Sequence, residues 1–298
     1  MRFHVNFTLP LGVQQSQLSL PHGGSMPVLV VGNQFCQATI AFQGAQVLCY
    51  ERKQSSPLLW LSDLNDWQAG KAIRGGIPIC FPWFGRHPTQ TDLPSHGFAR
   101  NMDWQLQQAT ENAHGHHLIF VLRDNAATRL LWNHAFEAVM DIHLGEQLHF
   151  EFRVKNNDQH PFAFSFAWHS YFQIEDITQT KLHGLEHTRF LDQLCTSASY
   201  NSGDTQPISF SSETDRIYQQ ASGNYQVRSA LESTIDIHSA SCSSVVVWNP
   251  WSEKAARLND MPNDAWKNML CVECGQVDTA TVHLAAGQPM VYQLTVSR

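Results

Sequence analysis

The sequence predicts an all-β protein, a large antiparallel β-sandwich with few short helices. Three observations support this prediction. Apolar residues recur at every second position in many short segments, turn-rich pieces separate these segments, and helical periodicity is nearly absent apart from "NDAWKNML", which is compatible with one short helical turn. Many short strands at regular spacing without intervening helices are typical of sandwiches and barrels.

The clearest strands lie in "AFEAVMDIHLGEQLHFEFRVKNND", residues 135–158. Apolar residues alternate there with charged residues and histidines on both sides of a short polar connection at Gly145–Glu146. A period of two with one polar face is typical of half-buried antiparallel strands, so this segment predicts a hairpin. Residues 279–298 show the same alternation around Gly287 and predict a second hairpin.

Further segments also have the composition of strands. They are "PVLVVG", "ATIAFQ", "AQVLCYE", "PLLWLS", "DWQLQQA", "HHLIFVLRD", "STIDIHS" and "SVVVWN". No Pro/Ser-rich linker divides the chain and no internal repeat stands out. We therefore expect a single domain over residues 1–298, and a large one for a sandwich.

The composition limits the classes of partner. With 43% hydrophobic and 15% charged residues, the 298-residue chain is expected to fold around a sizeable core. The net charge of -7 and the lack of a basic run argue against a nucleic-acid partner. The 7 scattered cysteines are an odd number and predict free thiols in a reducing compartment.

The location is inferred from what the sequence lacks. The start, "MRFHVNFTLPLGV", does not have the pattern of a signal peptide. No apolar run approaches the roughly eighteen residues of a membrane span. We expect a cytoplasmic protein with no membrane partner, and a monomer.

Two loop-like stretches carry arginines that suit an anionic ligand. In "KAIRGGIPICFPWFGR", Arg74 precedes a glycine pair, which permits unusual backbone angles and the close approach of a ligand. In "SHGFAR", His96 and Arg100 flank a small flexible segment, and the guanidinium fork suits phosphate. Taken alone, each stretch is equally compatible with an ordinary surface turn.

Two further stretches place a titratable residue in apolar surroundings. His169 of "WHSYF" is either a hydrogen-bonded core histidine or a proton-transfer group. Glu273 interrupts the apolar run "NMLCVECGQV", and alternation places it on the face of Cys271, opposite Val272 and Cys274. An uncompensated buried carboxyl has a raised pKa, which suits a general acid or base.

Two metal-like patterns are interpreted as structural. Cys271 and Cys274 form a C-x-x-C, but a structural zinc would need a second pair and a redox motif a strand-to-helix turn. The "HGHH" at residues 114–117 is interpreted as a solvated hairpin turn before "LIFVLRD". We expect neither a metal nor another cofactor.

Several motifs occur together in a fixed order: "IRGGIPICFPWFG", "HGFAR", "WHSYF", "TDRIY", "VVVWNPW" and "CVE". Each is weak alone, but the ordered set resembles the D-hexose-6-phosphate mutarotases (glucose-6-phosphate 1-epimerases) of the galactose mutarotase-like superfamily. The resemblance implies a β-supersandwich with a cleft on the concave face of one large sheet. It also implies an isomerase that interconverts the α and β anomers of a hexose 6-phosphate, a small-molecule sugar phosphate.

The resemblance also implies site residues. The catalytic pair is expected to be Glu273 as base and His169 as acid, with the substrate bound by Arg74, Ser95, His96, Arg100 and Asp215. Trp248 and Trp251 are expected to pack rather than to act. A base removes the C1 hydroxyl proton while an acid protonates the ring oxygen, so His169 must keep its proton at working pH.

Two other functions stay open at this point. One is an aldose 1-epimerase acting on unphosphorylated sugars, because arginine also binds sugar hydroxyls. The other is a non-catalytic carbohydrate-binding protein, whose aromatic residues would stack on sugars. The presence of both His169 and Glu273 in matching motifs favours the enzyme, since a pure binder has no need for an acid–base pair.

Overall fold

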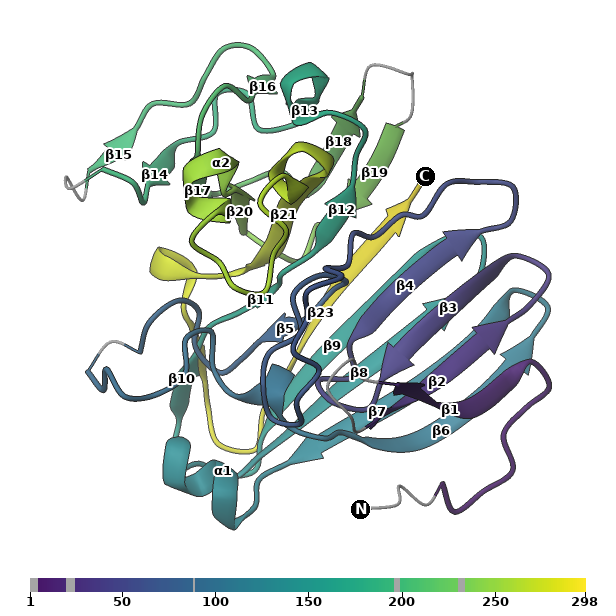
Figure 1. Ribbon diagram of the computed structural model, residues 1–298. Helices are drawn as coiled ribbons and strands as arrows, with labels where there is room; N and C mark the ends of the chain where they lie inside the picture. Colours follow the sequence, from purple (N-terminus) through teal and green to yellow (C-terminus); the bar gives the residue numbers. More distant parts are fainter. Residues whose placement is uncertain (1–4, 20–24, 88, 196–198, 230–233) are drawn as a thin grey trace.

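The computed structural model describes residues 5–19, 25–87, 89–195, 199–229 and 234–298. Within these residues, two large antiparallel sheets pack face to face (Figure 1). The nine-stranded sheet has the order β16 (Ile208–Ser209), β13 (Lys181–His183), β18 (Asn224–Arg228), β19 (Thr234–His238), β23 (Pro289–Ser297), β9 (Leu148–Asn156), β8 (Phe136–Leu144), β7 (Gly115–Arg123) and β6 (Gln105–Asn112).

The eight-stranded sheet forms the second layer. Its order is β15 (Tyr200–Asn201), β14 (Phe190–Asp192), β17 (Thr214–Gln219), β20 (Ser244–Asn249), β21 (Met269–Gln276), β11 (Phe166–Trp168) and β5 (Ile79–Cys80), and β12 (Tyr171–Gln173) also pairs with β21. The sandwich predicted from the alternating pattern is thereby confirmed.

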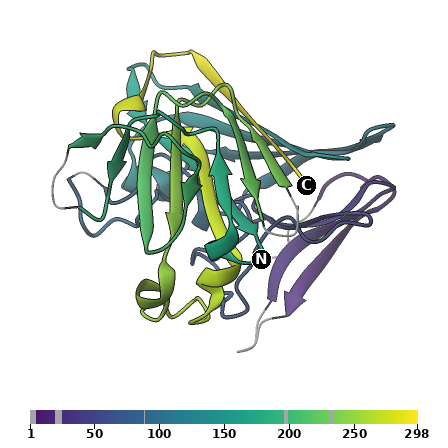
Figure 2. The ribbon, with the colours of Figure 1, turned by 90° about the horizontal axis from the view of Figure 1, so that it is seen from above.

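Smaller elements complete the described structure. A four-stranded sheet contains β1 (Val13–Ser19), β2 (Ser25–Gly32), β3 (Cys36–Ala41) and β4 (Val47–Arg52), and β10 (Phe162–Phe164) pairs with β22 (Val282–Leu284). Figure 2 shows the purple N-terminal strands at one side of the molecule and the green and yellow strands of the eight-stranded sheet at the other. The helices are short: α1 (Ala126–Leu131), α2 (Trp251–Ala255), and the 3₁₀ turns η1 (Ala99–Asn101), η2 (Ile177–Gln179), η3 (Ala265–Asn268) and η4 (Asp278–Ala280).

The hairpin predicted over residues 135–158 is confirmed, because β8 and β9 pair from Leu144 opposite Leu148 along their whole length. The prediction of a C-terminal hairpin is wrong. β22 pairs with β10, whereas β23 runs along β9 and β19 in the nine-stranded sheet. The alternating pattern correctly predicted that one face of each segment is buried. It gives no information on which other strand each segment pairs with.

Most of the other predicted strands form. The exception is "PLLWLS", which makes only isolated bridges from Leu59 to Phe172 and from Leu61 to Gly75. The helical turn expected in "NDAWKNML" is the 3₁₀ turn η3. All seven cysteines are free, as predicted from their odd number and scattered positions.

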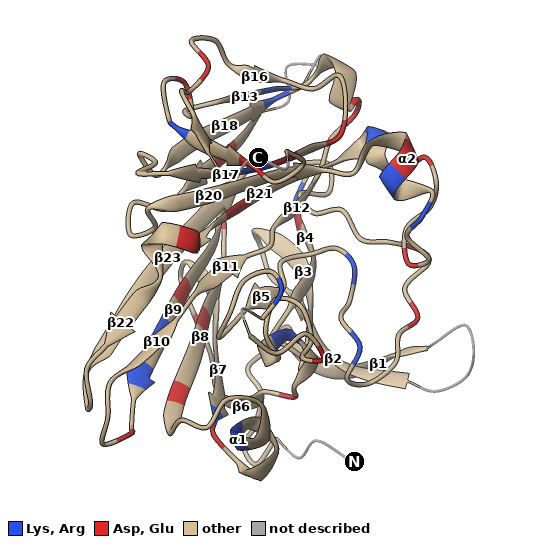
Figure 3. Cartoon of the chain, turned by 90° about the vertical axis from the view of Figure 1, so that its left-hand side faces the viewer, with Lys and Arg blue, Asp and Glu red and all other residues tan. Residues whose placement is uncertain are grey.

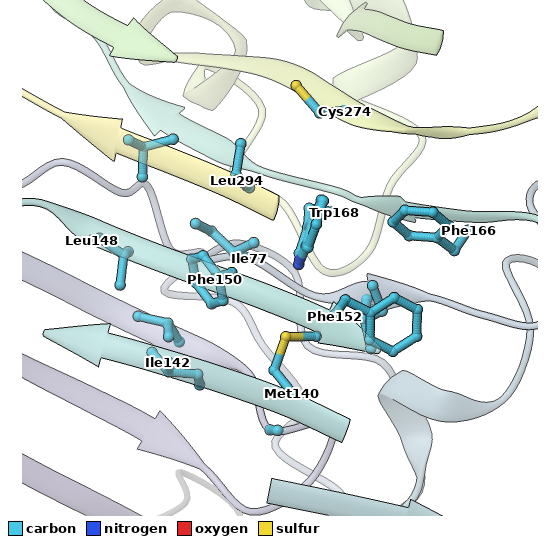
Figure 4. Packing of buried hydrophobic residues seen from close by; sticks show 14 of the residues in the cluster. Ile77, Met140, Ile142, Leu148, Phe150, Phe152, Phe166, Trp168, Cys274 and Leu294 are labelled. Atoms are coloured by element: carbon cyan, nitrogen blue, oxygen red, sulfur yellow. The ribbon is translucent and has the colours of Figure 1, made fainter. Parts of the chain in front are cut away.

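The main core lies between the two large sheets (Figure 4). Phe150 and Phe152 of β9 face Trp168 of β11 and Cys274 of β21, and the rings of Phe152 and Trp168 lie 6.4 Å apart. Because neighbouring residues of a strand point to opposite faces, the residues next to Trp168 and Cys274 are turned away from this core.

The glycine pair after Arg74 allows two chain segments to touch. A Cβ atom on Gly76 would lie 2.2 Å from the Val47 carbonyl oxygen, and one on Gly75 would lie 2.5 Å from the Leu61 Cα. Both glycines have positive φ angles, 117° at Gly75 and 63° at Gly76. The pair therefore packs backbone against backbone, and not against a ligand as the sequence alone had suggested.

Charged residues are spread over the surface. Figure 3 shows lysines and arginines scattered among acidic residues, with both signs on the short helix α2. Among the helices in the described part of the chain, none is both long and apolar enough to cross a membrane.

Candidate active site

A cavity of about 540 Å³ opens on the eight-stranded sheet, on the face turned away from the main core. The alternation of β20 shows this orientation, because Val245 and Val247 belong to the core whereas Val246 lines the cavity. Its volume suits a small molecule. All the residues expected at the site except Arg100 line it: His169, Glu273, Arg74, Ser95, His96 and Asp215.

Strand register brings His169 and Glu273 together. Trp168 of β11 pairs with Cys274 of β21, and Tyr171 of β12 pairs with Cys271. Between these two pairings, the short break between β11 and β12 places His169 beside Glu273. The His169 amide donates to the Pro78 carbonyl, 2.9 Å away, which fixes the backbone at the break.

The two side chains are close but not hydrogen-bonded. His169 Nδ1 lies 3.3 Å from Glu273 Oε1, and the side chains are only 8% and 2% exposed. Among the described residues, neither His169 Nδ1 nor Glu273 Oε2 has a hydrogen-bond partner. Buried polar atoms are normally paired, so these two atoms are available to a ligand in the cavity.

Aromatic rings fix the orientation of the histidine. The His169 ring stacks on Tyr171 with the ring centroids 4.6 Å apart and an interplanar angle of 4°. It also lies nearly perpendicular to the Trp248 ring, with the centroids 6.1 Å apart. Trp248 lines the cavity, whereas Trp251 packs on Trp266 at 4.3 Å. The expected packing role therefore fits Trp251, while Trp248 also forms part of the cavity wall.

Burial disfavours charge on both members of the pair. It raises the pKa of Glu273 well above its ordinary value, and the nearby Asp215 carboxyl adds to the rise. Burial also lowers the pKa of His169 well below its ordinary value, with further lowering from His96, Arg100 and Arg74. The free site therefore favours a carboxylic acid and a neutral imidazole, which differs from the protonated His169 expected from the sequence.

Arg74 is half-buried and already paired. Its Nε and Nη2 donate to the two oxygens of Asp260, each at 3.1 Å, and its Nη1 donates to the Tyr171 hydroxyl at 3.2 Å. The exposed turn considered for Arg74 is therefore ruled out. The ion pair with Asp260 also neutralises much of the charge that Arg74 could offer to an anion.

His96 is held as a neutral hydrogen-bond donor. The Gly85 amide donates to His96 Nδ1 at 3.4 Å, which leaves the proton on Nε2. Burial, Arg100 and Arg74 lower the pKa of His96 to about 3. Its ring lies 5.6 Å from that of His169, close enough for the protonation of one ring to disfavour that of the other.

Arg100 does not line the cavity. Its Nη2 donates to the Ser95 carbonyl oxygen at 3.0 Å, and its Nε has no hydrogen-bond partner among the described residues. The structure thus places Arg100 where its charge lowers the pKa of His96 and His169.

Asp215 enters the cavity from β17. Gln193 Nε2 donates to Asp215 Oδ1 at 2.5 Å. Burial raises the pKa of Asp215 to about 6, even though this hydrogen bond and the charge of Lys254 lower it. Asp215 is therefore ionised at neutral pH and protonated in mild acid.

Sequence reasoning missed three polar lining residues: Arg86, Gln193 and Lys254. Arg86 closes the stretch that begins at Lys71 and is exposed, and among the described residues no ion pair engages it. Lys254 Nζ lies 3.9 Å from Glu213 Oε1. The position of Arg86 at the end of "KAIRGGIPICFPWFGR" is the one signal in the sequence that marks it.

The C-x-x-C is not a chelating pair, because Cys271 and Cys274 point to opposite faces of β21. Cys271 shares the cavity side with His169 and Glu273, and one ligand atom of each lies within 4.8 Å of the others. Burial raises the pKa of the Cys271 thiol well above its ordinary value, so this sulfur is held as the weakly ligating protonated form.

A family model described as aldose 1-epimerase matches residues 27–297. The chain belongs to the aldose 1-epimerase family. This membership confirms the resemblance inferred from the ordered motifs. A protein of Salmonella typhimurium named "Putative glucose-6-phosphate 1-epimerase" is 35% identical over 270 residues, covering 90% of this chain and 89% of that protein. A plant protein of the same name, from Cenchrus ciliaris, is 34% identical over 266 residues, covering 86% and 79%.

Solved structures share the fold. The crystal structure of a "putative mutarotase" from Salmonella typhimurium has a TM-score of 0.88 and 32% identity to this chain, covering 97% of this chain and 94% of that one. A galactose mutarotase-like protein from Lactobacillus casei has a TM-score of 0.70 at 16% identity, covering 91% and 99%, which extends the likeness in fold alone.

Proposed function

We propose that the protein interconverts the α and β anomers of D-glucose 6-phosphate and related hexose 6-phosphates. The observation that carries this proposal is the approach of His169 Nδ1 to Glu273 Oε1, 3.3 Å, at the wall of a cavity of sugar size. Membership of the aldose 1-epimerase family supports the reaction, and the names of the relatives support the phosphorylated substrate.

The reaction needs one proton acceptor and one proton donor close together. The C1 hydroxyl oxygen and the ring oxygen are bonded to the same carbon, so groups that serve both must be neighbours. A pair of neutral groups meets this need: the imidazole takes the C1 hydroxyl proton and the carboxylic acid protonates the ring oxygen. The bond from C1 to the ring oxygen then breaks, and an aldehyde forms.

Ring closure uses the same pair in reverse. Rotation about the C1–C2 bond presents the other face of the aldehyde, and the protons return as the ring closes. The pair gains and loses no net proton over the cycle. It is thus immaterial to the overall balance whether Glu273 begins as base, as the family resemblance implies, or as acid, as its burial favours.

The lining suits a phosphate. Arg74, Arg86 and Lys254 all border the cavity, in a protein of net charge -7. Arg74 is paired with Asp260, so we assign the main phosphate contact to Arg86, with Lys254 beside it. His96 and Asp215 are the proposed partners of sugar oxygens, and Ser95 lies at the same edge.

Exchange spectroscopy by NMR tests the proposal. The rate of exchange between the two anomers is measured for glucose 6-phosphate and for free glucose, with and without the protein, in the presence of a chelator. We expect fast exchange of glucose 6-phosphate and much slower exchange of glucose. Faster exchange of free glucose would favour an aldose 1-epimerase of unphosphorylated sugars, and binding without exchange would favour a carbohydrate-binding protein.

A further inference from the structure

The histidines of "HGHH" do not form the solvated turn that the sequence suggested. Only His114 lies in the turn between β6 and β7. His116 is buried, with Nε2 2.7 Å from the Leu11 carbonyl oxygen and Nδ1 3.1 Å from Asn33 Nδ2. His117 lies in β7, on the outer face of the nine-stranded sheet, since its neighbour Leu118 points into the core.

On this outer face His117 meets two residues of β8. The register pairs His117 directly with His143, and Asp141 lies two residues before His143 on the same face. His117 Nε2 is 2.5 Å and His143 Nε2 is 3.2 Å from the same atom, Asp141 Oδ1. The two imidazole rings stack at 4.1 Å with an interplanar angle of 12°.

We propose that His117, Asp141 and His143 form a binding site for a divalent transition-metal ion such as Zn²⁺. Two neutral imidazoles and a carboxylate are ligands that Zn²⁺ and its neighbours prefer. The three ligand atoms lie within 4.8 Å of one another. Ligand atoms about 2.1 Å from a tetrahedral ion are roughly 3.4 Å apart, so small side-chain rotations complete this arrangement.

The backbone and the surroundings support the site. The ladder between β7 and β8 fixes the relative positions of the two histidines, so little ordering remains to be done on binding. The side chain of His143 is 47% exposed, which leaves an entry path and room for water in the remaining coordination positions. His149 of β9 is the residue paired with His143. Its Nδ1 atom forms a hydrogen bond with Thr295 Oγ1 at 2.8 Å.

The ion would join two strands and would not take part in catalysis. The cluster lies on the outer face of the nine-stranded sheet, whereas His169 and Glu273 lie on the other sheet, on the far side of the core. Binding to the folded state alone stabilises that state, by an amount that grows with the ratio of free ion to Kd. We therefore expect a higher Tm with Zn²⁺ and an unchanged rate of anomer exchange.

The test uses the full chain without an affinity tag, freed of metal by a chelator and dialysed. Zn²⁺ binding is measured by calorimetry, and Co²⁺ binding by visible absorption. We expect one ion per chain in the wild type, at least tenfold weaker binding in His117→Gln, His143→Gln and Asp141→Asn, and no change in the matched control His114→Gln. Zn²⁺ should raise the Tm of the wild type and the control only.

Three results would overturn the site. The first is equal binding by the wild type and the three ligand variants, and the second is no stoichiometric binding by the wild type. The third is a thiolate-to-cobalt charge-transfer band, which would place the ion on a cysteine, such as Cys271 in the cavity or the exposed Cys195. Because His143 is half exposed, His143→Gln keeps the fold, and circular dichroism checks this in each variant.

Discussion

The imidazole of His169 and the carboxyl of Glu273 approach within 3.3 Å, yet no hydrogen bond joins them. Both are buried, and burial favours the neutral form of each. The arrangement is that of an acid and a base held ready for a third participant. A substrate whose two reacting oxygens share one carbon supplies the missing partner for both groups.

The protonation state of the free pair can be observed directly. Because burial raises the pKa of Glu273, we expect a protonated carboxyl in the ligand-free protein at neutral pH. Infrared spectroscopy should show a carboxylic-acid C=O band that Glu273→Gln removes and that the exposed control Glu253→Gln leaves in place. An ionised Glu273, together with an imidazolium signal from His169 in ¹⁵N NMR, would make Glu273 the base and His169 the acid in ring opening.

The same burial predicts a cost in stability. A carboxyl whose folded-state pKa is raised keeps its proton while the unfolded chain loses it, so stability falls as the pH rises above the unfolded pKa of about 4.3. The loss is about 1.4 kcal/mol per pH unit until the folded pKa is reached. Urea unfolding from pH 5 to 8 should therefore show that the free energy of unfolding of Glu273→Gln increases relative to that of the wild type as the pH rises. A constant difference would mean that Glu273 ionises normally in the fold.

The raised pKa of Asp215 leads us to expect that KM depends on pH. Its pKa of about 6 means that the carboxylate becomes a protonated acid in mild acid and loses strength as an acceptor for a sugar hydroxyl. Hydrogen bonds to charged groups contribute roughly 1.5–3 kcal/mol, or about one to two decades in affinity. KM should rise by about that factor as the pH falls through 6.

The phosphate of the substrate also titrates near this pH. The variant Asp215→Asn therefore separates the titration of Asp215 from that of the phosphate. Asp215→Asn should show a raised KM at neutral pH and only the phosphate titration below it. If the wild type and Asp215→Asn have the same pH profile, Asp215 does not bind the sugar through its charge.

Two arginines are expected to act differently. Arg86 lines the cavity with no ion pair among the described residues, so Arg86→Gln should raise the KM for glucose 6-phosphate about tenfold to a hundredfold, by the loss of a charge-assisted hydrogen bond. Arg100 does not line the cavity. Arg100→Gln should instead shift the pH profile through His96 and His169.

The comparison is made with both sugars at two salt concentrations. The Arg86 effect should be confined to the phosphorylated sugar, and the wild-type preference should weaken as salt screens the exposed guanidinium. Equal loss for both sugars in Arg86→Gln, or a larger KM effect in Arg100→Gln, would move the phosphate contact away from Arg86.

Local patterns in the sequence predicted the faces of strands well. Alternation placed Glu273 with Cys271 and opposite Val272 and Cys274, as the structure has it. The same rule could not reveal that the C-terminal strands belong to different sheets, because the period of two says nothing about the partner strand. The approach of His169 to Glu273 followed from the motif resemblance, not from periodicity.

Loop residues were harder to predict, because no period constrains their direction. Arg100 donates to the Ser95 carbonyl oxygen and does not line the cavity, whereas Arg86, which the sequence analysis did not single out, does line it. A role of Arg100 in binding the substrate stays a prediction. His116 is buried because the distant Leu11 and Asn33 satisfy its ring nitrogens, which a local pattern cannot indicate. The single domain, the monomeric state and the cytoplasmic location stay predictions.

The central claim is that His169 and Glu273 together carry protons in anomer exchange. NMR exchange spectroscopy on glucose 6-phosphate, with the wild type, Glu273→Gln, His169→Ala and the double variant, tests it most directly. We predict that each single change lowers kcat by about 10²–10⁴-fold with the fold intact, and that the double variant loses little more, because groups that act as a unit are not additive. Near wild-type exchange in either single variant would contradict the account.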